Sequence, residues 1–188
     1  MMLSLTAKLN ITRECNHAAF VHYSSPNERT GVLFNLMDHN SQTEMQLLVD
    51  SLNGGDDISG ISDLDLFVAY FLGLKGLQTM STKVFAGSQD RPSAPNFVIL
   101  ISEGWWDDAI NCCPDPFKSG SVAKLQAQTD TIFAIGVDCD VCFRPKCDIP
   151  GIPDAVVLSR ITGDDSNVYD KTNYMEIAQR ICALLQSC

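Results

Sequence analysis

The sequence predicts an α/β fold with a doubly wound, mostly parallel sheet, one antiparallel edge strand and helices on both faces. Residues 97–102, "FVILIS", and residues 131–137, "TIFAIGV", are apolar almost throughout. Such runs lack the alternation of a half-exposed strand and are typical of strands that a parallel sheet buries on both faces. Segments with helical spacing separate the strand-like segments along the chain, and this alternation indicates parallel strands covered by helices.

The antiparallel part of the sheet is expected near the start of the chain. Residues 18–24, "AAFVHYS", and residues 30–36, "TGVLFNL", both have strand-like composition. The polar stretch "SPNER" separates them and is rich in turn-forming residues. We expect a hairpin here, at one edge of the sheet.

The helices are indicated by the recurrence of apolar residues at helical intervals. Ser41 and Glu44 have the spacing of a capping box, which marks a helix start. Helices are expected in four segments: 41–52, from near 62 to 77, 121–128, and from about 173 onward. The last of these is expected to bury Tyr174, Ile177, Ile181 and either Leu184 or Leu185. A third short apolar run, residues 155–159, is taken as a further strand.

Composition narrows the class of protein. The chain has 188 residues and 45% apolar residues, which predicts one globular domain over residues 1–188. Its formal net charge of −10 repels phosphate backbones and anionic lipid surfaces, so nucleic acid is not expected as a partner. No run approaches the length of a membrane-spanning helix, and the start of the chain does not resemble a signal peptide.

The eight cysteines leave three interpretations open. An even number, mostly late in the chain, favours disulfides in an oxidising compartment. Residues 139–147, "CDVCFRPKC", also contain a C-x2-C pair, but a structural zinc site needs four ligands and a second such pair is absent. Reduced thiols are the remaining alternative. The adjacent Cys112 and Cys113 cannot easily bond to each other, so each would need a separate partner.

The candidate functional edge lies after the strand at 97–102. In open α/β sheets, ligands bind at the carboxyl ends of the strands, which places Ser102, Glu103 and Gly104 at that edge. Trp105 and Trp106 follow, with Asp107 beside them. The two tryptophans either cover the sheet edge as core residues or stand exposed as binding contacts, because aromatic residues are enriched at interface hot spots.

Five fragments in order resemble one family. They are "HAAFVHYSS", "FNLMDHNSQTEMQLLVDSLNGG", "DISG", "APNFVILISEGWWDD" and "TIFAIGVD". In order and spacing they are similar to the von Willebrand factor type A domain, and the resemblance covers about residues 5 to 187. It implies a doubly wound sheet and a protein-binding role, often toward collagens, other matrix components or receptors. It does not imply an enzyme.

The family's metal-ion-dependent adhesion site is altered in this sequence. That site holds Mg²⁺ or Mn²⁺ through a D-x-S-x-S motif after the first strand, a Thr of a Gly-rich loop and the Asp of a T-D-G motif. Here the first strand and its motif are missing, because the chain begins within the first helix of the resemblance. Asp57 stands in place of the Thr, Ser59 at the following Thr, and Glu103 in place of the Asp. We therefore expect weak or no metal binding.

These three residues also have ordinary interpretations. Glu103 fits an acidic residue at a helix or loop start, where it compensates backbone N–H groups. Asp57 and Ser59 are turn formers in any Gly-rich loop.

The missing strand has a consequence for the fold. In the family it is central and hydrogen-bonded on both sides, so its loss leaves backbone groups unpaired. We expect either that the strands at 18–24 and 97–102 pair directly, or that the chain is unstable or oligomeric without the missing segment.

Three functions are consistent with the sequence. The first is a protein-binding module of the type A kind, extracellular or secreted, with little dependence on metal. The second is a structural piece of a longer polypeptide, with no binding activity of its own. An enzyme is disfavoured, because Ser102 lacks the G-x-S-x-G elbow of a serine nucleophile and no His is placed to act as its base.

Overall fold

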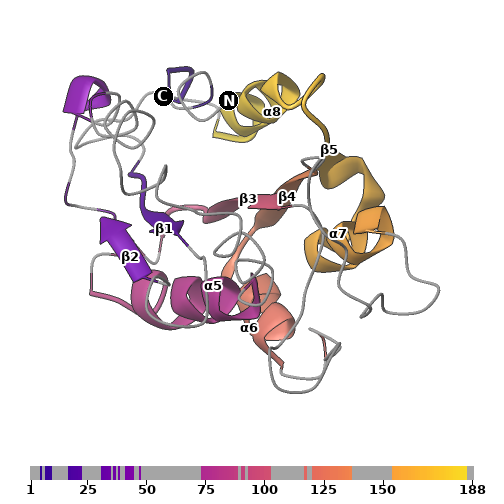
Figure 1. The fold of residues 1–188 in the computed structure, drawn as a ribbon. Helices are drawn as coiled ribbons and strands as arrows, with labels where there is room; N and C mark the ends of the chain where they lie inside the picture. Colours follow the sequence, from indigo (N-terminus) through magenta and orange to yellow (C-terminus); the bar gives the residue numbers. More distant parts are fainter. Residues whose placement is uncertain are drawn as a thin grey trace, which may run out of the picture.

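The computed structural model describes residues 5, 7–9, 17–22, 31–34, 36, 38, 41–44, 47, 73–88, 90–91, 93–102, 117, 120–136 and 154–185. Along them the elements are β1 (Phe20–His22), β2 (Gly31–Phe34), α5 (Gly73–Thr79), the π-helix η1 (Met80–Val84), β3 (Phe97–Ser102), α6 (Ser121–Gln128), β4 (Thr131–Gly136), α7 (Asp154–Thr162), the 3-10 helix η2 (Asp165–Asn167), β5 (Val168–Tyr169) and α8 (Met175–Leu185). Figure 1 shows strands covered by helices, which is the expected α/β class.

The parallel part of the fold is a three-stranded sheet of order β3-β4-β5. β3 and β4 pair in parallel along their whole length, from Phe97 opposite Thr131 to Ser102 opposite Gly136. β5 continues the sheet on the other side of β4. The two apolar runs are therefore parallel neighbours, as predicted, whereas β5 was not predicted.

The antiparallel hairpin is also confirmed. β1 and β2 pair in antiparallel orientation, with Val21 opposite Val32 and an irregularity between Phe20 and Val21. In the described part of the chain this pair forms a sheet of its own, separate from β3-β4-β5. The expected direct pairing of the strands at 18–24 and 97–102 is therefore not found there.

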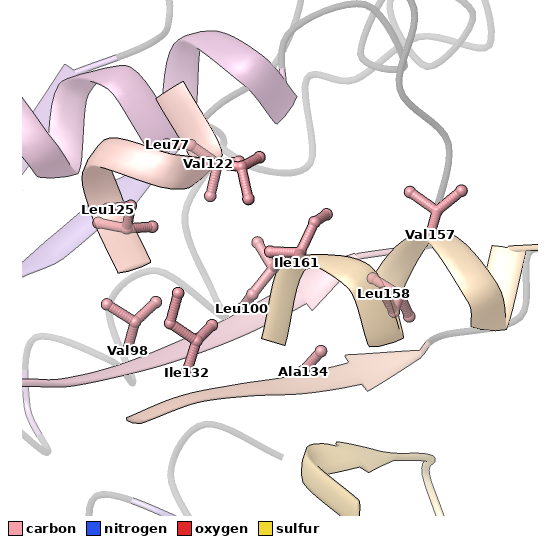
Figure 2. Packing of buried hydrophobic residues seen from close by; sticks show 10 residues of the cluster. All are labelled: Leu77, Val98, Leu100, Val122, Leu125, Ile132, Ala134, Val157, Leu158 and Ile161. Atoms are coloured by element: carbon pink, nitrogen blue, oxygen red, sulfur yellow. The ribbon is translucent and has the colours of Figure 1, made fainter. Parts of the chain in front are cut away.

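One face of the three-stranded sheet carries the larger core, because successive side chains of a strand point to opposite faces. Val98 and Leu100 of β3 and Ile132 and Ala134 of β4 point to this face. Helices α5, α6 and α7 cover it (Figure 2) with the buried side chains Leu77, Val122, Leu125, Val157, Leu158 and Ile161.

The opposite face carries a second core. Phe133 and Ile135 of β4 contact Tyr169 of β5 and the buried face of α8, which consists of Ile177, Ala178 and Ile181. The Phe133 ring stacks on Phe97 with a centroid distance of 6.4 Å and meets Tyr169 edge-on at 6.3 Å. The sheet is thus covered on both faces, as a doubly wound fold requires.

Leu5 and Leu9, near the start of the chain, pack on this second face. Leu5 is helical and buried in the cluster with α8, and Leu9 packs against the same cluster. The Lys8 N–H donates to the Leu5 carbonyl, as in a helical turn. These residues cover the sheet rather than adding a strand to it.

Hydrogen bonds at the amino ends of β3 and β4 fix the register. The Asn96 N–H donates to the Asp130 carboxylate at 2.7 Å, and the Asp130 N–H donates back to the Asn96 carbonyl at 2.8 Å. The Asn96 side-chain amide donates to the Gln128 carbonyl, which ties the end of α6 to the start of β3.

The expected strand at 155–159 is wrong, because these residues belong to helix α7. Val157, Leu158 and Ile161 are buried at helical spacing, while Val156 and Arg160 are exposed. Four consecutive apolar residues conceal this period within a five-residue window, and it emerges only over the whole helix. The helix ends at Thr162. Gly163 follows it with a φ of +76°, which suits glycine, and its N–H donates to the Ser159 carbonyl.

The other expected helices are described only in part, because residues 45–46 and 48–72 lie outside the described residues. The Glu44 N–H donates to the Ser41 hydroxyl at 3.2 Å, which is half of the predicted capping box. The helix expected to end near residue 77 continues as η1 to Val84, and α6 matches residues 121–128. In α8, Ile177 and Ile181 are buried as predicted, and Tyr174, just before the helix, is partly buried. Leu184 is 54% exposed, and the side chain of Leu185, the other expected buried leucine, lies outside the described residues.

Two buried hydroxyl groups differ in their hydrogen bonding. Ser81 of η1 is 1% exposed, and its Oγ has no hydrogen-bond partner among the described residues. Thr162 is also buried, but its Oγ1 donates to the Ser159 carbonyl at 2.9 Å and accepts from the Asp164 N–H. An unpaired buried hydroxyl is costly, whereas a paired one contributes to stability.

Removing these two hydroxyl groups should therefore change the free energy of unfolding in opposite directions. We expect Ser81→Ala to stabilise the chain by about 1 kcal/mol. Thr162→Val keeps the side-chain shape and is expected to destabilise by about 1 kcal/mol. Urea unfolding followed by circular dichroism measures both. Destabilisation by Ser81→Ala would contradict the assignment of Ser81 as an unpaired group.

Candidate functional site

Three parallel strands end at one edge of the sheet. Ser102, the last residue of β3, lies opposite Gly136, the last residue of β4. Ile135 of β4 lies opposite Tyr169, the last residue of β5. The chain therefore leaves this edge after residues 102, 136 and 169. This is the edge where open α/β sheets bind their ligands.

The structure places β3 as the sequence predicted, so Glu103 is the residue that follows this strand at the carboxyl edge. Glu103 itself and the predicted contacts Trp105, Trp106 and Asp107 lie outside the described residues. The same holds for Asp57 and Ser59 of the Gly-rich stretch.

Among the residues that the structure describes at this edge, Asp170 is acidic. The sequence analysis did not single it out. It follows β5 directly, and its Oδ1 accepts hydrogen bonds from the Thr172 hydroxyl and N–H, both at 2.6 Å. A longer bond of 3.3 Å comes from the Asn173 N–H. In return the Asn173 side chain accepts from the Asp170 N–H at 2.8 Å. The stretch "DKTN" thus forms a turn that leads from β5 into α8, and the Asx-turn preference of Asp and Asn was its sequence signal.

These hydrogen bonds favour the ionised form of Asp170. The Thr172 hydroxyl, and then the Thr172 N–H, lower the pKa of Asp170 below its ordinary value of 3.8. The carboxylate stays ionised at neutral pH, and Oδ1 is occupied by protein donors. In this arrangement Asp170 holds the turn in shape rather than offering that oxygen to a ligand.

Arg180 of α8 ties β5 to this helix through hydrogen bonds. Its Nη1 donates to the Ser166 carbonyl at 2.7 Å and to the Tyr169 hydroxyl at 2.6 Å. Its guanidinium also lies 5.3 Å from the centre of the Phe133 ring. Hydrogen bonds from Ser166, with a smaller contribution from the charge of Arg180, lower the pKa of Asp164. A strand of two residues is thereby fixed to the helix that follows it.

Within the described ranges, no group of three or more His, Cys, Asp or Glu side chains is arranged to hold a metal ion. Cys182 is exposed and not in a disulfide, and it lies 3.7 Å from the Lys8 carbonyl. The other seven cysteines lie outside the described residues, so the predicted disulfides and the zinc alternative stay predictions. No helix in the described part of the chain is long and apolar enough to cross a membrane.

The turn at Asp170 should make stability depend on acid pH. Because the folded-state pKa is lowered, the ionised carboxylate contributes stability fully above the ordinary pKa of 3.8. That contribution is lost as the pH falls through the folded-state pKa. We expect Asp170→Asn to be less stable than the wild type near neutral pH and to approach it below this value.

Chemical denaturation at a series of pH values measures this difference. Thr172→Val removes the main donor to the carboxylate and should show the same trend in weaker form. A difference between wild type and Asp170→Asn that stays constant with pH would contradict the role of the charge.

Comparison with known proteins agrees with this architecture. No curated protein matches the chain at a significant level. A family model, the von Willebrand factor type A domain, matches residues 1–181, which is nearly the whole chain. The match covers the hairpin, the parallel sheet and most of α8. The chain therefore belongs to the von Willebrand factor type A domain family.

Proposed function

We propose that this chain is a non-catalytic protein-binding module that binds its partner at the carboxyl edge of the β3-β4-β5 sheet. The observation that carries the proposal is membership of the type A family, whose domains generally mediate protein interaction and adhesion. The geometry is consistent with it, because three strands end together at that edge.

The proposed contacts follow β3. Trp105, Trp106 and Asp107 begin three residues after the end of this strand, whose register with β4 is fixed along its full length. Tryptophan is among the residues that contribute most to protein interfaces, because it buries a large area at little cost in side-chain entropy. We assign the main affinity to these aromatic side chains, and orientation to Asp107.

In this proposal a metal ion contributes little to partner binding. Glu103, Asp57 and Ser59 together offer two carboxylates and one hydroxyl, whereas Mg²⁺ prefers six oxygen ligands and releases its waters reluctantly. At the described part of the edge, Asp170 Oδ1 already accepts hydrogen bonds from Thr172 and Asn173. If an ion binds, it would supply positive charge toward an acidic group of the partner.

The proposed setting is extracellular, and the proposed partner is a collagen or another matrix protein. Both follow from the family and, for the setting, from the eight cysteines. The net charge of −10 favours partners with basic surfaces, since like charges slow association.

The second candidate is a structural unit of a longer polypeptide or an oligomer, without binding activity of its own. It is favoured by the separation of β1-β2 from β3-β4-β5 in the described part of the chain. Joining two small sheets into one would bury more backbone groups and stabilise both.

A binding measurement distinguishes these candidates. We expect the purified chain to bind immobilised fibrillar collagen or another matrix protein in surface plasmon resonance. Trp105→Ala and Trp106→Ala should each weaken that binding by about tenfold or more. Leu184→Ala removes an exposed apolar side chain from α8 and is the matched control. A folded chain that binds no matrix protein would favour the structural candidate.

Metal dependence is tested separately by isothermal titration with Mg²⁺ and Mn²⁺. We expect a dissociation constant for Mg²⁺ that is millimolar or weaker, because too few ligands replace the ion's water shell. Glu103→Ala should then change little. A micromolar site that disappears in Glu103→Ala would show that the family's metal mechanism operates in this chain.

A further inference from the structure

We draw no further inference here: the strongest candidate, the two buried side-chain oxygens without a hydrogen-bond partner at the contact between η1 and α6, Ser81 Oγ and Gln128 Oε1, belongs to the helix packing in which the Gln128 amide donates to the Ser81 carbonyl, and nothing in the described part of the chain indicates a ligand that would reach them.

Discussion

The burial of β4 on both faces is the constraint on which the rest of the structure depends. Ile132, Phe133, Ala134 and Ile135 are each at most 2% exposed, and their side chains alternate between two cores. A strand of this kind needs a hydrogen-bonded neighbour on each side and an apolar cover on each face, because neither its backbone nor its side chains can meet water. β3 and β5 supply the neighbours, while α5, α6 and α7 cover one face and α8 the other (Figure 1).

The position of the carboxyl edge follows from this arrangement. The paired hydrogen bonds between Asn96 and Asp130 align β3 and β4 at their amino ends, so that equal lengths bring Ser102 level with Gly136 at the other end. On the far side of β4, a strand of two residues has too few ladder bonds to hold its own place. Arg180 compensates, because it bonds to the backbone before β5 and to the Tyr169 hydroxyl within it. Hydrogen bonds therefore hold both outer strands of the described sheet in place beside β4.

The elements that can be predicted from the sequence are those in which the pattern of apolar residues extends over enough residues to be recognised. The runs at 97–102 and 131–136 are longer than the run at 155–159 and richer in β-branched and aromatic residues, which favours a buried strand over a buried helix. Val168 and Tyr169 are too few to show any period, so β5 went unnoticed, and residues 155–159 were assigned to a strand although the helical period of α7 extends to Ile161. Residues 57, 59, 103 and 105–107 were assigned by resemblance and edge position and lie outside the described residues. Asp170 was missed because its role depends on β5.

The carboxyl edge also bears on how a type A domain binds a partner if its metal site is altered, as the sequence resemblance implies. An ion that bridges two acidic groups contributes affinity through charge, and replacing that contribution requires either more apolar contact or a smaller entropic cost of binding. In the proposed function, Trp105 and Trp106 supply that apolar contact. The strand that precedes these tryptophans ends at Ser102, which is paired with Gly136 of β4. In the proposed function, therefore, the affinity that an adhesion site of this family draws from a metal ion comes instead from apolar contact at the carboxyl edge of the sheet.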